Sequence, residues 1–172
     1  MFIDGAGITT RMTRSYARAP KGQRAFGTVP CGSWRRLTLL GALGCDGVVA
    51  AMSVEAATST PVFLAFIERV LIPELCRTKP GAVVVMDNLS PHKAAAVRDT
   101  LEAAGFTPLY LPRYAPDLSP IEPMWSKIKT LLRAKAARTV EALTDALGPV
   151  IDAVTAQDAR GWFRHCGYPA PG

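Results

Sequence analysis

A short apolar run that ends in an acid constrains the fold of this chain more than any other feature. Residues 82–86 are Ala-Val-Val-Val-Met, and Asp87 follows them directly. A continuous apolar run of this length is typical of a central strand that is covered on both faces. Ligands of α/β proteins bind beyond the carboxyl ends of such strands. The run therefore predicts a sheet enclosed by helices, with Asp87 at the carboxyl end of a strand, where ligands of such proteins bind.

Turn residues and hydrophobic periodicity place the other elements. Residues 2–4 predict a short first strand that Asp4 ends or interrupts, and the Asp46-Gly47 pair indicates a hairpin between two apolar runs. The remaining elements follow from spacing and from capping residues. The sequence predicts strands over residues 34–45, 47–54 and 106–111, and helices over residues 60–76, 90–104, 120–137, 139–154 and 157–165.

The order of these elements predicts the fold class. A three-stranded antiparallel start, followed by strands that are reached through helical crossovers, implies a mixed sheet with helices on its faces. This order matches the α/β, ribonuclease H-like fold, with a mixed five-stranded sheet and helices on both faces. A length of 172 residues fits one such domain.

Three acids are expected on one side of this sheet. Asp4 lies in the first strand, Asp87 ends the fourth, and Glu122 lies in the first turn of the helix after the fifth. The first and fourth strands are expected to be adjacent and parallel, so Asp4 and Asp87 would project close together. The helix that begins near Pro120 would then bring Glu122 over them.

Converging carboxylates suit the cleavage of a phosphodiester bond. Two metal ions about 3.5–4 Å apart stabilise both the attacking and the leaving oxygen of a phosphoryl displacement. Mg²⁺ prefers oxygen ligands and keeps several waters, and Mn²⁺ suits the same ligands. We therefore take Asp4, Asp87 and Glu122 as the candidate catalytic residues and metal ligands, for two Mg²⁺ ions with Mn²⁺ as a substitute.

Two of the acids also have a purely structural interpretation. Asp4 fits a solvated residue at a strand end. Glu122 fits the acid of a capping box that Ser119 begins, with Pro120 at the first helical position, which is worth about 1 kcal/mol to a helix. The joint placement of the acids, rather than any one of them, supports the metal hypothesis.

The charge distribution predicts contacts with DNA. The net charge is +6, and residues 5–45 contain no Asp or Glu. Basic side chains give salt-sensitive phosphate contacts of little sequence specificity, although a solvated loop and a solvated helix face remain open alternatives. His92 could equally be a structural hydrogen bonder. The candidate DNA-binding residues are Arg11, Arg14, Arg18, Lys21, Arg24, Arg35, Arg36, His92, Lys93, Tyr114, Lys127 and Lys129.

The cysteines and the hydropathy of the sequence indicate the cellular compartment of the protein. The four cysteines form no CxxC pair, which favours reduced thiols. No apolar run reaches membrane-spanning length, and the N-terminus shows no charged-then-apolar leader. These features predict a cytoplasmic protein, and the expected DNA contacts predict association with the nucleoid.

Two motifs resemble the catalytic core of DDE transposases. They are Asp87-Asn88-Leu89-Ser90-Pro91-His92-Lys93 and the stretch Leu111-Pro112-Arg113-Tyr114-Ala115-Pro116-Asp117-Leu118-Ser119-Pro120-Ile121-Glu122. The chain is most similar to the bacterial insertion-sequence branch of the mariner-like superfamily, which favours the 34 residues found here between Asp87 and Glu122. The resemblance runs from Phe2 to about Tyr168.

This resemblance implies a Mg²⁺-dependent nuclease and strand transferase. Such an enzyme cuts DNA at the terminal inverted repeats of its own element and joins the freed 3′ hydroxyls to target DNA. Asp87 and Glu122 match the second and third metal ligands by motif, and Asp4 matches the first by position. A homodimer that holds two DNA ends is expected by analogy.

The chain departs from the family pattern in three places. Gly5 replaces an acid that usually follows the first aspartate, and Arg113 replaces a residue that is often proline. The helix-turn-helix domain of full-length relatives is absent, so residues 1–172 are expected to be a single catalytic domain, and a separately encoded subunit could supply DNA reading. Two rival functions therefore stay open: a ribonuclease H-like nuclease without strand transfer, and a remnant that only binds DNA or dimerises.

Overall fold

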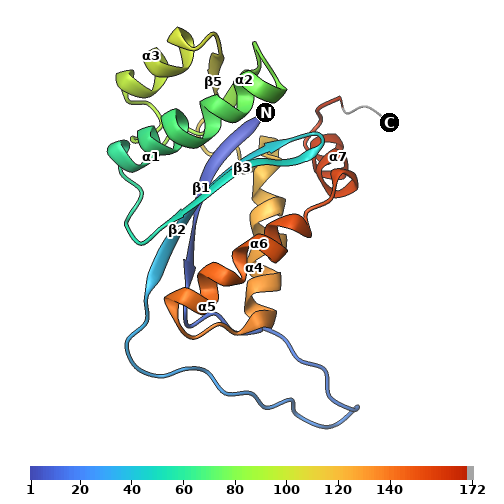
Figure 1. The fold of residues 1–172 in the computed structure, drawn as a ribbon. Helices are drawn as coiled ribbons and strands as arrows, with labels where there is room; N and C mark the ends of the chain where they lie inside the picture. Colours follow the sequence, from blue (N-terminus) through green and yellow to red (C-terminus); the bar gives the residue numbers. More distant parts are fainter. Residues whose placement is uncertain (170–172) are drawn as a thin grey trace.

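The apolar run forms the fourth strand across a five-stranded sheet, between the N-terminal strand at the centre and the last strand at the edge (Figure 1). The computed structural model describes residues 1–169. The order across the sheet is β3-β2-β1-β4-β5, in which β1 pairs antiparallel with β2 and parallel with β4. The strands are β1 (Phe2–Thr9), β2 (Arg36–Gly44), β3 (Gly47–Val54), β4 (Val83–Met86) and β5 (Thr107–Tyr110). The predicted mixed five-stranded sheet is thereby confirmed.

Helices cover both faces of this sheet, as predicted (Figure 1). Helices α1 to α3 lie over one face and α4 to α7 over the other. Their bounds are α1 (Thr60–Phe66), the π-helical turn η1 (Ile67–Leu71), α2 (Ile72–Thr78), α3 (Ala95–Ala103), the 3-10 turn η2 (Pro116–Leu118), α4 (Ile121–Lys135), α5 (Val140–Asp145), α6 (Leu147–Asp152) and α7 (Ala156–His165). No helix of the described residues is long and apolar enough to cross a membrane.

Alternation along the strands divides the apolar residues into two cores. Ile3 and Leu40 face one way and pack with α1, η1, α2 and α3. Phe2 and Leu39 face the other way and pack with α4 to α7. Because successive side chains of a strand point to opposite faces, each apolar strand supplies both cores. The sheet is thus fixed from both sides.

The first strand differs from its prediction. It continues through Asp4 to Thr9, because Ala6 and Ile8 are buried against the α4 side of the sheet. Asp4 therefore lies within the strand rather than at its end. Asp87 does follow the last residue of β4, as predicted.

Two predicted helices are interrupted. The helix predicted over residues 60–76 contains the π-helical turn η1 just before Pro73, and the helix predicted over residues 139–154 divides at Ala146, before Pro149. Proline has no backbone N–H for the carbonyl four residues earlier, so the regular ladder of hydrogen bonds is lost at both places.

The helix predicted over residues 90–104 begins only at Ala95. Residues 89–93 form a turn instead, in which the amides of His92 and Lys93 both donate to the carbonyl of Leu89, at 3.0 and 3.1 Å. His92 and Lys93 are therefore not residues of a first helical turn.

A long, exposed excursion joins β1 to β2 (Figure 1). Residues 10–35, here called the basic arm, extend away from the sheet, and Tyr16 and Phe26 are almost fully exposed. Only the base of the arm is tied down. Arg138 donates to the carbonyls of Thr10 at 3.2 Å and Met12 at 2.9 Å.

Candidate metal centre

Strand pairing brings Asp4 and Asp87 together. Phe2 of β1 pairs with Val85 of β4. Asp4 and Asp87 each lie two residues further along, so their side chains leave the sheet on the same face as this pair. Carboxylate oxygens of Asp4 and Asp87 and a ring nitrogen of His92 all lie within 4.8 Å of one another.

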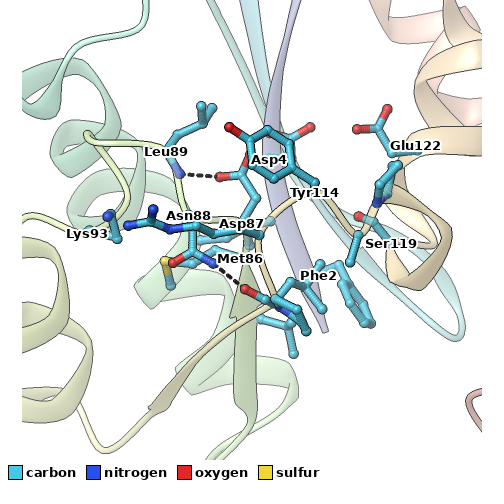
Figure 2. Close-up of a pocket in the computed structure, with 17 residues that line it drawn as sticks. Phe2, Asp4, Met86, Asp87, Asn88, Leu89, Lys93, Tyr114, Ser119 and Glu122 are labelled. Atoms are coloured by element: carbon cyan, nitrogen blue, oxygen red, sulfur yellow. Dashed lines mark hydrogen bonds between the residues drawn. The ribbon is translucent and has the colours of Figure 1, made fainter.

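Glu122 approaches the two aspartates from the other side of the same cavity. The cavity has a volume of about 400 Å³, and Asp4, Asp87 and Glu122 all line it. Figure 2 shows the aspartates on the strand side and Glu122 on α4, with its carboxylate directed toward them. We call these three residues the carboxylate site. All three acids that the sequence selects thus line one cavity, whereas the group of ligand atoms within 4.8 Å of one another includes Asp4 and Asp87 but not Glu122.

Glu122 does not act as the acid of a capping box, which was its structural alternative. Pro120 is the N-cap of α4, and no side chain makes a capping hydrogen bond there. The amide of Glu122 donates to the carbonyl of Ser119 at 3.1 Å, so the predicted capping box is wrong. Within residues 1–169 the Glu122 carboxylate has no ion pair and no side-chain hydrogen bond, and it lies at the helix end that favours negative charge.

Asp4 is held by a tryptophan from the same helix. The indole Nε1 of Trp125 donates to Oδ2 of Asp4 at 3.0 Å. Gly41, which pairs with Asp4 across β1 and β2, leaves room for the indole, since a Cβ there would lie 2.8 Å from Cη2 of Trp125. Burial raises the pKa of Asp4 to about 6, and the nearby charges of Asp87 and Glu122 act in the same direction.

Asp87 is held by donors from the turn that follows β4. Its Oδ1 accepts from Nδ1 of His92 and from the amide of Leu89, the latter at 3.0 Å. Burial acts to raise the pKa of Asp87, but these two hydrogen bonds outweigh it and hold the pKa below its usual value. Asn88 donates to the carbonyl of Leu111 and so ties this turn to the loop after β5 (Figure 2).

The donor set fits hard divalent cations. It consists of carboxylate oxygens, with no lysine or arginine paired to any of the three acids among residues 1–169. The mutual repulsion that contributes to the raised pKa of Asp4 is what a bound cation would relieve. Mg²⁺ and Mn²⁺ take such ligands. His92 is enclosed and already bonded to Asp87, so we assign it to that carboxylate rather than to a metal.

The candidate DNA-binding residues fall into distinct places. Lys93 and Tyr114 line the cavity, and Tyr114 is fully exposed with a left-handed backbone, φ 58°. His92 is fully buried, so its side chain is not accessible to DNA. This burial favours the alternative that His92 is a structural hydrogen bonder. Lys127 is paired with Asp158 of α7, and Lys129 is half-buried on α4.

The remaining candidates belong to the basic arm and its end. Arg11 lies over the ring of Trp34 at 5.7 Å, and Arg35 pairs with Glu55 at 3.2 Å. The guanidinium of Arg36 covers Gly7 of the neighbouring strand. The other four, which make no ion pair within the described residues, are exposed: Arg14, Arg18, Lys21 and Arg24.

Sequence reasoning missed the bond from Trp125 to Asp4. The sequence indicates only a core residue at this position, and Trp125 is indeed 3% exposed. The available signal was its spacing, because a residue three positions after Glu122 lies on nearly the same face of the helix.

The departure at Gly5 lies away from the carboxylate site. A side chain at this position would meet Leu40 at 2.8 Å and Thr58 at 3.7 Å, on the face of β1 opposite to Asp4. The glycine therefore removes no ligand from the three acids.

Comparison with solved structures shows a shared fold. The chain superposes on the Mos1 transposase paired-end complex with left transposon end with a TM-score of 0.73 at 20% identity, over 96% of this chain and 51% of that one. For the Mos1 transposase catalytic domain with raltegravir and Mg the TM-score is 0.71 at 17% identity, over 96% and 77%. The chain thus spans about half the length of the Mos1 chains in the paired-end complexes. The predicted ribonuclease H-like fold is confirmed.

Comparison of sequences identifies the family. No curated protein matches the chain significantly. A family model described as DDE superfamily endonuclease matches residues 1–144, which include Asp4, Asp87 and Glu122. Since this match covers most of the sequence, the chain belongs to the DDE superfamily endonucleases.

Proposed function

We propose that this chain is the catalytic domain of a transposase from the bacterial insertion-sequence branch of the mariner-like superfamily. The whole chain would be one catalytic domain that cuts DNA at the ends of its element and transfers the 3′ hydroxyls into target DNA. The observation that carries the proposal is the meeting of Asp4, Asp87 and Glu122 at one open cavity. Endonuclease family membership supports it.

The carboxylate site would hold two divalent cations, Mg²⁺ in the first place and Mn²⁺ as a substitute. When bound, the two ions stabilise the attacking and the leaving oxygen of a phosphodiester. Asp4 and Asp87 hold their oxygens on the strand side, and Glu122 adds its carboxylate from α4. Structures of Mos1 transposase are described with Mn and with Mg.

DNA would reach the cavity along surfaces that the basic residues mark. Lys93 and Arg113 line the cavity and provide charge for a phosphate. Tyr114 stands at its mouth, fully exposed on a strained backbone, as expected of a side chain that contacts a ligand. The exposed cations of the basic arm supply sequence-independent contacts to the DNA backbone.

Assembly follows by analogy with Mos1. The Mos1 structures include a paired-end complex and a strand transfer complex. We propose that this chain likewise acts on two element ends as a homodimer, with end recognition by a helix-turn-helix domain outside the chain.

A strand-transfer assay separates a transposase from a nuclease. Duplexes that carry the inverted repeats flanking the gene, already cut to expose the 3′ hydroxyl, are mixed with plasmid, the chain and Mg²⁺. We expect joined products with the wild type and none with Glu122→Gln. Asp152→Asn, at an exposed position on α6, is the matched control and should join normally.

Other results of this assay would support one of the two rival functions. Because end recognition is assigned to a domain outside the chain, the pre-cut duplexes are supplied in large excess. Nicking of plasmid without joined products under these conditions would support a ribonuclease H-like nuclease instead. DNA binding without either reaction would support a remnant that only binds DNA or dimerises.

A further inference from the structure

Each aspartate of the carboxylate site is held by a buried N–H donor that does not itself line the cavity. His92 donates to Asp87, and Trp125 donates to Asp4. Neither donor is among the residues that surround the cavity. Trp125 belongs to the apolar core on the α4 side of the sheet, and His92 packs against Phe63 of the core on the other side.

His92 makes a single side-chain hydrogen bond. An ionised carboxylate only accepts, so the proton in this bond belongs to Nδ1 of His92. The other ring nitrogen, Nε2, is the one buried side-chain polar atom without a partner among residues 1–169. The ring packs against Phe63 at 4.1 Å between centroids, and Tyr110 donates to the backbone carbonyl of His92 at 3.2 Å. Within residues 1–169, this fully buried imidazole thus has Asp87 as its only side-chain hydrogen-bond partner.

Trp125 is fixed in a comparable way. It lies on α4 one turn after Glu122, and its ring packs over Gly41 of β2. Its Nε1 reaches Oδ2 of Asp4. Docking of α4 on the sheet therefore sets the orientation of Asp4 at the same time as it places Glu122.

We propose that His92 and Trp125 are positioning residues, which each fix one carboxylate oxygen so that the other faces the cavity ready for a divalent cation. Oδ1 of Asp87 is occupied by His92 and by the amide of Leu89, which leaves Oδ2 free. Oδ2 of Asp4 accepts from Trp125, a backbone hydrogen bond from Gly5 also reaches this carboxylate, and no side chain among residues 1–169 donates to Oδ1. Carboxylates that bind metals are commonly hydrogen-bonded in this way, and loss of such a partner weakens metal binding about 10- to 100-fold. The inference rests on the proposed metal site.

The test for His92 compares two variants of similar size. In His92→Asn the side-chain amide nitrogen can take the place of Nδ1, whereas His92→Leu offers no donor. Mn²⁺ affinity is measured on the full chain without DNA, from the electron paramagnetic resonance signal of free Mn²⁺. Melting in EDTA reports the stability of the metal-free fold. We expect His92→Leu to bind Mn²⁺ at least about tenfold more weakly and His92→Asn to bind near the wild-type value. Equal Mn²⁺ affinities of the wild type and His92→Leu would overturn the role of His92, and so would equal losses in both variants.

The test for Trp125 uses a second tryptophan as its control. Trp125→Phe keeps an aromatic ring in the core but removes the N–H. Trp162→Phe makes the same change in α7, at a partly buried position that bonds no carboxylate. We expect Mn²⁺ affinity to fall about tenfold in Trp125→Phe and to stay unchanged in Trp162→Phe. Equal affinities in the two variants would contradict the role of Trp125.

Failure of this inference is distinguishable from failure of the proposed function. If the wild type does not bind Mn²⁺, or if Asp87→Asn binds it equally well, the metal site itself is wrong and the positioning roles fall with it. If Asp87→Asn loses Mn²⁺ while the His92 and Trp125 variants bind it normally, the metal site stands and only the positioning roles are overturned.

Discussion

Asp4 is in an unfavourable environment in the metal-free protein. Its carboxylate is largely buried, it faces Asp87 and Glu122, and its pKa is raised to about 6 from an ordinary 3.8. A raised carboxyl pKa means that the folded state disfavours the ionised form. The ionised residue therefore lowers stability above pH 6, and this effect disappears as the pH falls toward 3.8.

Replacing Asp4 should stabilise the metal-free protein in a pH-dependent manner. The two pKa values correspond to a difference of up to roughly 3 kcal/mol. In EDTA at about pH 7, Asp4→Asn is expected to have the higher free energy of unfolding, with an advantage that shrinks between about pH 6 and pH 4. Urea unfolding of both proteins across this range measures it. Equal stability at every pH, or a more stable wild type at neutral pH, would show that the environment of Asp4 is described wrongly.

The sequence predicts some of these residues better than others. Asp87 and Glu122 were predictable because each sits next to an identifiable strand or helix end. Whether the Glu122 carboxylate is free was not predictable, since Ser119-Pro120-Ile121-Glu122 also fits a capping box. The structure excludes the box, because Pro120 is the N-cap and no side chain caps the helix. The burial of His92 depends on Phe63, a residue of a distant helix, so no local pattern could reveal it.

Helix α4 is the element on which the site depends. It carries Glu122 and Trp125 on its first turns and packs along the sheet through Ile128 and Leu132. The C-cap residue that follows the helix, Ala136, has a left-handed backbone with φ 50° and ψ 39°. A residue with a Cβ costs about 1–2 kcal/mol in this conformation.

The same substitution should have opposite effects two residues apart on α4. Ala136→Gly relieves the left-handed backbone and is expected to raise the free energy of unfolding by roughly 0.5–1 kcal/mol. Ala134→Gly, at an exposed helical position, should lower it by roughly 0.5–1 kcal/mol. Chemical denaturation of both variants checks the pair. A loss of stability in Ala136→Gly would argue against the left-handed end of this helix.

The types of the helices and strands were predictable from the sequence, whereas the breaks within two of the helices were not. Continuous apolar runs and the Asp46-Gly47 hairpin define the strands, and β3 has the predicted bounds. The prolines at 73 and 149 were visible in the sequence, but their effect depends on how the surrounding turns pack. The sequence predicts that Asp4 ends or interrupts its strand because the apolar pair Phe2-Ile3 is followed by a more polar stretch, and the burial of Ala6 and Ile8 becomes apparent only in the folded sheet.

At the scale of the whole molecule, positive charge is concentrated away from the sheet. The basic arm, residues 10–35, extends from the strand that carries Asp4, and its exposed cations include Arg14, Arg18, Lys21 and Arg24. The sequence revealed an acid-free stretch but not its shape, because few local hydrogen bonds define an exposed segment.

Neutralising the arm should weaken DNA binding in proportion to the number of phosphates that its cations pair with. Changing the four exposed cations of the arm to Gln is expected to reduce the slope of log affinity against log salt by up to about 0.9 per residue, without affecting Mn²⁺ binding. A control of equal net charge changes four exposed arginines on other elements: Arg69, Arg77, Arg98 and Arg164. If both variants show the same reduction in slope, net charge rather than the arm accounts for DNA binding.

The claim that three carboxylates form one metal site for DNA cleavage is tested most directly by nicking of supercoiled plasmid in Mg²⁺. Asp87→Asn keeps the shape of the side chain but removes the charge of the best-supported ligand. We predict that the wild type nicks DNA only when Mg²⁺ or Mn²⁺ is present, and that Asp87→Asn does not nick it with either ion while binding DNA as tightly as the wild type. Unchanged nicking by Asp87→Asn would contradict the account.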